Sequence, residues 1–307
     1  MQREQLEKGK IFETIVGSHL YNLNEEDSDE DYAGVIIPGK SVIIGPFFPF
    51  EQLQGPGDRV LYNITKAFKL FADANPNMLD LLFAPEDKWL CATKHWEEVH
   101  AHKNLFLSTK IKFTYSGYAM AQLKRMSRHR DWLLAPPGAK PKREDYGLTE
   151  RPLIPTELRK AVLSIPSRYL SEIVVEEAKK EARYHSAIVE WDQYTKWIKN
   201  RNPARAETEK LVGYDTKNAM HLVRLMKMAK EIITTGEVNV VRTDDREELL
   251  DIKHGKRSYD ELVAWAEEQD KELDNIYESG KSPLPKTPDT KKLNELCVEV
   301  IESYWSA

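Results

Sequence analysis

Two neighbouring features near the N-terminus carry residue types that could do chemistry. Gly17 and Ser18 are followed by a run at 25–31 in which six of seven residues are acidic, and the run ends in the Asp-x-Asp pair of Asp29 and Asp31. Backbone N–H groups of a glycine turn can approach a phosphate closely, and a serine hydroxyl adds a donor. Paired carboxylates offer the hard oxygen ligands that Mg²⁺ and Mn²⁺ prefer. Together they predict a site that binds a nucleotide's phosphates at one end and a divalent metal at the other.

Three interpretations of the acidic run compete. Most acidic runs are solvated loops. Asp27, Asp29 and Asp31 match three ligand positions of a calcium-binding EF-hand, but Tyr32 stands where glycine is required and Pro38 where glutamate is required. In a catalytic metal site, a strand that begins near residue 28 would turn Asp29 and Asp31 to one face. Two ions held there would activate an attacking hydroxyl and stabilise the leaving phosphate.

The segments that must position these residues are short strands followed by helices. Apolar and β-branched runs predict strands at 11–16, 31–37, 42–44 and 60–64. From residue 65 the apolar spacing becomes helical, although a brief strand is predicted at 238–241. The predicted fold is α+β, with a small mixed-sheet domain at 1–105 and a larger, mostly helical domain at 106–307. The later predicted helices are 93–104, 108–134, 167–200, 205–235, 244–253 and 258–278.

Composition narrows the class of protein. The 307 residues are 41% hydrophobic and 31% charged, which is typical of a soluble globular protein rather than a disordered one. No apolar run approaches the roughly 18 residues that a membrane span needs, so no membrane partner is expected. The first ten residues are charged and lack the apolar region of a signal peptide. Two cysteines, Cys91 and Cys297, cannot form a disulfide framework and favour a reducing, cytoplasmic location.

The motif resembles that of the nucleotidyltransferase (DNA polymerase β-like) superfamily, in which a Gly-Ser turn precedes an Asp-x-Asp strand and a third carboxylate follows on a later strand. The chain is most similar to a bacterial and phage branch of predicted nucleotidyltransferases, the RNA repair pathway polymerase-β-like family. That branch reads Gly-Ser-x-x-Tyr-Gly and then Ser-Asp-x-Asp-x-x-Gly-Val. Here residues 17–22 read Gly-Ser-His-Leu-Tyr-Asn and residues 28–35 read Ser-Asp-Glu-Asp-Tyr-Ala-Gly-Val. Asn22 replaces the usual glycine, and asparagine also tolerates a left-handed backbone.

The resemblance continues at 75–82, 216–225, 236–240 and 282–285. It implies a polymerase-β-like fold and transfer of a nucleoside monophosphate from an NTP to an acceptor hydroxyl, with release of pyrophosphate. It also implies that Asp29, Asp31 and a third carboxylate bind Mg²⁺ or Mn²⁺, while Gly17 and Ser18 hold the phosphates. Asp58 stands where the third carboxylate is expected, and Glu51 is the alternative. In the family's setting the cytoplasm is that of a bacterium or a phage-infected host.

One predicted helix carries a cationic stripe. Lys217, His221 and Arg224 are four and then three residues apart, so they share a face, and their neighbours are almost all apolar. A helix that is apolar on most sides is buried, and buried cations need anionic partners. The partner is either the triphosphate, in which case all three residues bind the nucleotide, or structural carboxylates from other helices.

The segment 124–143 is strongly basic, since it holds seven lysines and arginines against the single acid Asp131. Such a patch attracts a polyphosphate backbone, and Tyr118, Trp132 and Tyr146 could stack on bases. The alternative is a solvated helix end. The patch favours an RNA end, tRNA in particular, as acceptor over a protein or a small molecule; a catalytically silent nucleotide- or RNA-binding protein is the remaining alternative. The predicted nucleic-acid contacts are Lys124, Arg125, Arg128, Arg130, Lys140, Lys142 and Arg143.

Overall fold

A five-stranded mixed sheet organises the N-terminal part of the chain. The computed structural model describes residues 6–26, 28–45, 47, 50–155, 157–201 and 203–307. The sheet order is β3-β4-β2-β1-β5, and only the pairing of β2 with β4 is parallel. The strands that the sequence predicted at 11–16, 31–37 and 60–64 are confirmed. The observed strands are β1 (Lys10–Val16), β2 (Asp31–Ile36), β3 (Gln52–Gln54), β4 (Arg59–Asn63) and β5 (Trp89–Ala92).

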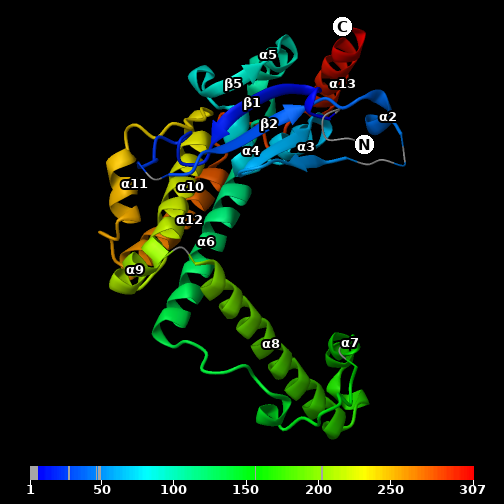
Figure 1. Ribbon diagram of the computed structural model, residues 1–307, viewed down its shortest axis with the longest axis vertical. Helices are drawn as coiled ribbons and strands as arrows, with labels where there is room; N and C mark the ends of the chain where they lie inside the picture. The colour runs from blue at the N-terminus through cyan, green and yellow to red at the C-terminus, as the bar shows by residue number, and fades with distance from the viewer. Residues whose placement is uncertain (1–5, 27, 46, 48–49, 156, 202) are drawn as a thin grey trace. The chain divides into compact units, whose positions relative to one another are not determined.

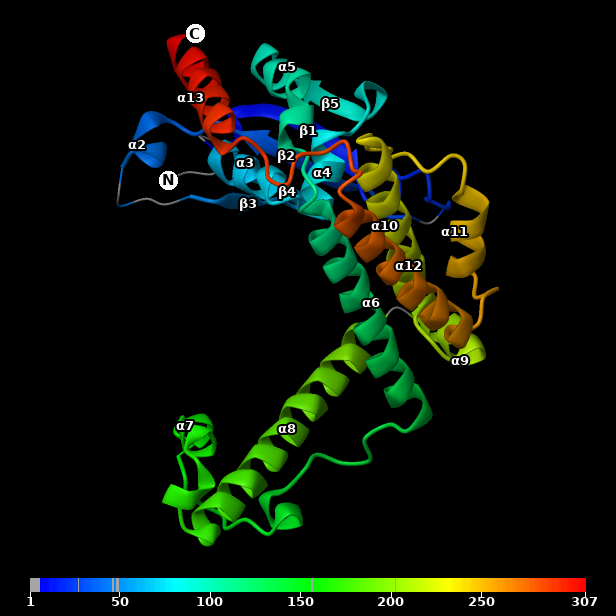
Figure 2. The same cartoon turned by 180° about the vertical axis from the view of Figure 1, so that it is seen from behind.

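Helices α3 and α4 pack on one face of this sheet, together with α5 and α13 (Figures 1 and 2). Asn63 caps α3 by accepting a hydrogen bond from Thr65, and Asn75 caps α4 in the same way. The remaining elements are helical. The helices are α2 (Lys40–Ile43), α3 (Ile64–Ala72), α4 (Pro76–Leu82), α5 (Lys94–Ala101), α6 (Ile111–Leu134), α7 (Arg159–Ser164), α8 (Glu172–Asn200), α9 (Pro203–Val212), α10 (Thr216–Thr235), α11 (Arg246–Lys253), α12 (Tyr259–Ser279) and α13 (Thr290–Ser306).

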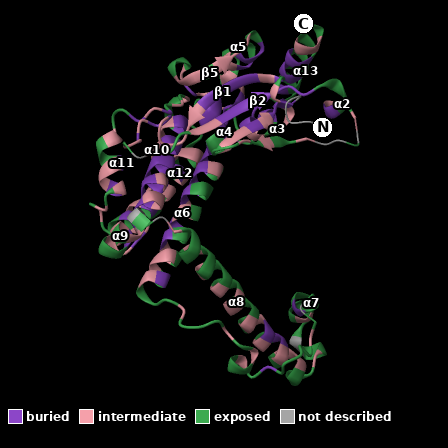
Figure 3. Ribbon diagram, viewed as in Figure 1, coloured by how far each residue is buried: buried purple, intermediate pink, exposed green. Residues whose placement is uncertain are grey.

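The chain divides into two compact units. The first unit combines residues 1–126 with 216–307, and the second unit is residues 127–215. The sequence predicted one helical domain for all residues after 105. In the structure, residues 216–307 instead belong to the same compact unit as the sheet. The reason is visible in the contacts, because α13 packs on α3 and α5, and α10 contributes buried residues along nearly its whole length (Figure 3).

The second unit has its own small aromatic core. Trp132, near the end of α6, is 4% exposed and lies against Tyr194 and Trp197 of α8. His129 stacks on the same indole with ring centroids 5.6 Å apart. This packing joins α6 to α8 within the unit. It also removes Trp132 from the surface, so its predicted role in stacking on RNA bases is wrong.

Two predicted strands are absent from the described structure. Residues 42 and 43 belong to α2 and Ile44 caps it, because a short apolar run cannot distinguish a strand from one helical turn. Residues 238–241 form an irregular segment between α10 and α11. The sequence also missed β3 and β5, which contain only three and four residues. Within the described ranges, no helix combines the length and the apolarity that crossing a bilayer requires.

Candidate active site

The parallel pairing of β2 and β4 brings two aspartates together. Asp31 is the first residue of β2, and Asp58 immediately precedes β4. Tyr32 aligns with Arg59 in the parallel ladder, so Asp31 and Asp58 lie at the same end of neighbouring strands. The backbone N–H of Tyr32 donates to the carbonyl of Asp58 over 3.3 Å. Residues 27 positions apart in sequence are therefore neighbours across the sheet.

Asp31 sits in an excess of negative charge. Burial raises the pKa of its carboxyl above the ordinary aspartate value, and the charges of Asp58 and Asp29 raise it further. Lys217 and His19 act in the opposite direction. Asp29 is exposed and precedes β2 rather than belonging to it, so the predicted strand alternation does not position it. The three predicted carboxylates and Lys217 nonetheless form one electrostatic group centred on Asp31.

The Gly17–Ser18 turn follows β1 and lies against this group. Gly17 has a φ of +68°, and a Cβ atom placed on it would lie 2.6 Å from Oδ2 of Asp31. Only glycine therefore allows the turn to come so close to the carboxylate. The turn is compact, since the carbonyl of Gly17 accepts from both Leu20 and Tyr21. Asn22 has a φ of +62°, which confirms the prediction that it takes the left-handed position of the usual glycine.

Two residues of the acidic run, Glu25 and Ser28, make contacts outside it. The ring of His19 is 3.1 Å from the carbonyl of Ser28, and Glu25 accepts from Lys253 and His254 beside α11. These contacts hold the pKa of Glu25 below its usual value, with the hydrogen bond from Lys253 as the largest cause. Asp27 lies outside the described residues. Glu25 and Ser28 are thus held against neighbouring parts of the fold.

The cationic stripe of α10 splits between two environments. Lys217, in the first turn, acts on Asp31, and His221 is partly buried one turn later. Arg224 is 3% exposed, and its partners are Asp80 of α4 and the ring of Tyr21. The sequence left open whether Arg224 pairs with a triphosphate or with a structural carboxylate. In the structure its partner is the carboxylate of Asp80.

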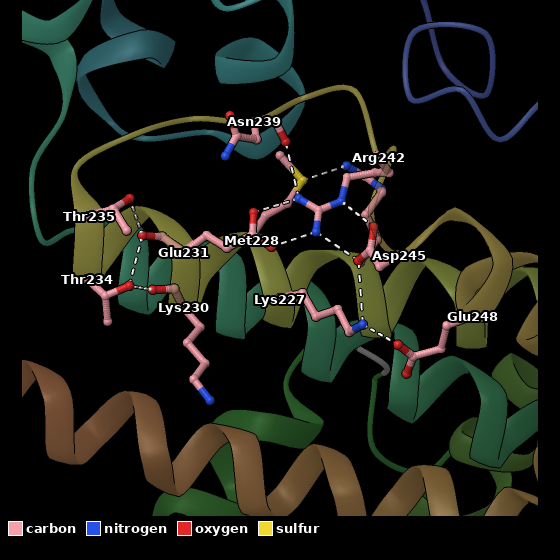
Figure 4. Close-up of polar contacts among 11 residues, drawn as sticks. Lys227, Met228, Lys230, Glu231, Thr234, Thr235, Asn239, Arg242, Asp245 and Glu248 are labelled. Carbon is pink, nitrogen blue, oxygen red and sulfur yellow. Dashed lines mark hydrogen bonds and ion pairs between the residues drawn. The ribbon is translucent and has the colours of Figure 1, made fainter.

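Behind the turn, residues 238–245 form the wall of a polar groove of about 1190 Å³ between α10, α11 and α12. Arg242 is 5% exposed and lies between Glu231 and Asp245, donating to both carboxylates (Figure 4). Lys227 pairs with Asp245 and Glu248 in the same figure. The backbone N–H of Arg242 donates to the carbonyl of Tyr21 over 3.0 Å. The wall of the groove thus also holds the turn, a function that the sequence did not reveal.

The donor set suits Mg²⁺ or Mn²⁺. Among the described residues there is no ready-made group of three or more histidine, cysteine, aspartate or glutamate side chains that could hold a metal ion. Magnesium is usually bound by one or two carboxylates and completed by substrate phosphates and water. Burial and then the charge of Asp58 raise the pKa of Asp31, and a divalent cation would offset the repulsion between these carboxylates. Asp31 and Asp58 are therefore suited to an ion whose coordination is completed by substrate phosphates and water. They are less suited to an ion that protein side chains enclose completely.

The basic residues of 124–143 differ in what they contact. Arg130 donates to the carbonyl of Gly213, and Arg143 pairs with Glu181, so both hold the second unit together. Arg128 donates to Gln193 but stays exposed. The structure leaves four more cations exposed, which are Lys124 and Arg125 in the first unit and Lys140 and Lys142 in the second.

The N-terminal part of the chain is similar to a known protein family. Residues 3–154 match the model of the RNA repair pathway DNA polymerase beta family. A curated relative from Enterobacteria phage T4, described as an uncharacterized 38.9 kDa protein in the nrdC-mobD intergenic region, is 25% identical over 128 residues. That alignment covers 38% of this chain and 38% of the relative. No solved structure matches the chain.

The matched range contains the turn, the three aspartates and Asp80, but it ends before α10. It is shorter than the resemblance predicted from the sequence, which extended to segments after residue 216. The contribution of α10 to the site therefore rests on the geometry alone.

Proposed function

This chain belongs to the RNA repair pathway DNA polymerase beta family, and we propose that it transfers a nucleoside monophosphate from an NTP to a hydroxyl group at an RNA end. Pyrophosphate is the leaving group. The observation that supports this most is the electrostatic group of Asp29, Asp31 and Asp58 beside a glycine turn. The family supports a nucleotidyltransferase-like role, and the RNA acceptor is our proposal. Both cysteines are free thiols, which supports a cytoplasmic location.

Each residue has a distinct part in the proposed reaction. The backbone of Gly17 and the hydroxyl of Ser18 bind the β- and γ-phosphates. Lys217 neutralises the triphosphate from the side of α10, with His221 next to it on the helix. Asp31, Asp58 and Asp29 hold Mg²⁺ or Mn²⁺, which when bound neutralises phosphate charge and favours ionisation of the acceptor hydroxyl. Most of the rate enhancement comes from positioning and charge.

A transfer assay tests the proposal directly. Purified protein is incubated with Mg²⁺, each labelled NTP in turn and total cellular RNA, and the label is followed into RNA. We expect transfer by the wild type and none by Asp29→Ala/Asp31→Ala. Label that resists RNase but not protease would assign a protein acceptor instead. Transfer that persists in the double variant would contradict the proposed site.

We propose that the exposed cations of 124–143 bind the phosphate backbone of the acceptor. Lys140 and Lys142 are both exposed, and Lys142 makes a long surface contact of 3.6 Å to Glu144. An exposed ion pair of this kind contributes little and competes weakly with a phosphate.

Replacing both lysines, as Lys140→Gln/Lys142→Gln, is expected to weaken RNA binding about tenfold at low salt. It should also reduce the slope of log affinity against log salt by about 1.4, since each single-strand phosphate contact contributes roughly 0.7. Fluorescence anisotropy with labelled single-stranded RNA at several salt concentrations measures both. Lys196→Gln/Lys199→Gln, two exposed lysines on α8, is the matched control. Equal losses in both variants would mean non-specific attraction.

A further inference from the structure

Tyr21, Asp80 and Arg224 form a buried polar cluster directly behind the Gly17–Ser18 turn. The hydroxyl of Tyr21 donates to Asp80 over 2.6 Å, and Arg224 contacts the same carboxylate oxygen at 3.4 Å. The guanidinium of Arg224 also covers the ring of Tyr21 at 3.7 Å. Asp80 and Arg224 are 1% and 3% exposed. Three segments far apart in sequence, the turn, α4 and α10, therefore meet in this cluster.

The polar groups of this cluster contribute little to the stability of the fold. Oδ1 of Asp80, Nε of Arg224 and the hydroxyl of the neighbouring Tyr115 are buried without a hydrogen-bond partner in the described residues. Burial raises the pKa of Asp80, which means that the protein interior disfavours the charged carboxylate. A buried ion pair that is not fully hydrogen-bonded often contributes less stability than apolar side chains of the same volume. A role other than stabilising the fold therefore explains better why these polar groups are buried together.

Helix α10 acts on the turn and on Asp31 through three residues spaced seven apart. The charge of Lys217 acts on Asp31, and Arg224 covers the ring of Tyr21. Glu231 accepts hydrogen bonds from Arg242 (Figure 4), and the backbone N–H of Arg242 donates to the carbonyl of Tyr21. Residues seven apart lie two turns apart near one face of a helix. One rigid element therefore sets the distance between the lysine, the carboxylates and both sides of the turn.

We infer that Asp80 and Arg224 are positioning residues for nucleotide transfer, which act through Tyr21 to fix the Gly17–Ser18 turn relative to Lys217 and Asp31. The inference rests on the proposed function. Tyr21 transmits the position because its own N–H donates to the carbonyl of Gly17 over 3.2 Å. When the ring moves, the phosphate-binding turn moves with it. A shift of about 1 Å at such a turn can reduce transfer about a hundredfold.

The test replaces the ion pair by apolar residues of similar volume, Asp80→Leu/Arg224→Met. The matched control is Lys230→Met/Glu272→Leu, an ion pair that also joins α10 to another helix but does not touch the turn. Thermal melting, NTP binding by calorimetry, and kcat and KM for transfer are measured on each protein. We expect the test variant to melt near the wild-type temperature, to raise KM and lower kcat, and to lose 30- to 100-fold in kcat/KM. The control should keep wild-type kinetics.

The outcomes separate positioning from a general packing role. Loss of packing alone reduces the active fraction, so kcat falls while KM stays constant, and this pattern would overturn the inference. A folded test variant within twofold of wild-type kcat/KM would overturn it as well. If that variant does not fold, Tyr21→Phe decides, since it removes one hydroxyl; about a tenfold loss supports the inference and wild-type kinetics refute it. If the wild type binds NTP without transferring it, the ratio of NTP dissociation constants decides. If the wild type binds no NTP, the proposed function itself fails.

Discussion

Asp31→Asn is expected to melt at a higher temperature than the wild type at pH 7 and to transfer nucleotide about a thousandfold more slowly. The catalytic loss follows because asparagine removes one of the charges proposed to hold the metal, and a loss of several kcal/mol of charge stabilisation corresponds to about that factor. The gain in stability follows because burial, and then the charge of Asp58, hold the pKa of Asp31 above its usual value. Calorimetric melting in EDTA and the transfer assay measure the two effects.

The sign of the stability effect depends on pH. A carboxyl whose pKa is raised on folding contributes stability fully below its unfolded pKa of about 3.9 and loses that contribution as pH rises through the raised, folded value. At pH 7 the ionised Asp31 therefore destabilises the fold, and the neutral asparagine removes that cost. The difference in melting temperature between the two proteins should be largest near neutral pH and shrink as the pH is lowered toward 4.

Added Mg²⁺ should reverse the order of the melting temperatures of the wild type and Asp31→Asn. Added Mg²⁺ is expected to raise the melting temperature of the wild type, since an ion that binds only the folded state stabilises it, and to change that of Asp31→Asn much less. Asp73→Asn serves as the control, because Asp73 is an exposed aspartate that pairs with Lys110 away from the site. Equal responses to Mg²⁺ in all three proteins would show that Asp31 does not hold the ion.

Gly17→Ala is expected to reduce kcat/KM about a hundredfold and to destabilise the protein by about 1–2 kcal/mol. Two causes add. An L-residue at a φ of +68° is strained, and the new Cβ atom would lie 2.6 Å from Oδ2 of Asp31, so the carboxylate or the turn must move. Transfer kinetics and chemical denaturation measure the two effects.

Gly280→Ala is the matched control for that variant. Gly280 has nearly the same φ, +65°, but nothing lies within 4 Å of where its Cβ would stand. This variant should therefore show the backbone strain alone, about 1 kcal/mol, with unchanged kinetics. If both variants lost the same activity, or if Gly17→Ala kept wild-type transfer, the close approach of the turn to Asp31 would have no functional meaning.

Local pattern was sufficient for the core of the site. The Gly-Ser turn and the start of β2 follow from short-range spacing, because a turn between strands is determined by a few residues. Asn22 was predictable for the same reason, since its side chain tolerates a left-handed backbone at its own position. Local signals describe this part of the fold well. Asp58 was expected only from the resemblance, with Glu51 as the alternative, because the parallel pairing of β2 with β4 is not a local signal.

Partners from distant segments were not predictable. Arg224 shares its stripe with Lys217, yet its partner Asp80 comes from a helix 144 residues earlier, and nothing in the spacing of either segment indicates their contact. Trp132 looked like an exposed aromatic at a basic helix end, but Tyr194 and Trp197 bury it. Tertiary packing decides the environment of such residues, so their roles could be stated from the sequence only as alternatives.

The first compact unit is built from two separate stretches of chain, with 127–215 between them. During synthesis, the sheet and all three aspartates leave the ribosome well before α10 exists. Asp80 lacks Arg224 until residue 224 has been translated, and the turn lacks its anchor through Arg242 until residue 242 has been translated. Since a chain folds as its segments emerge, the three aspartates are in place before the residues that fix the proposed phosphate-binding turn have been made.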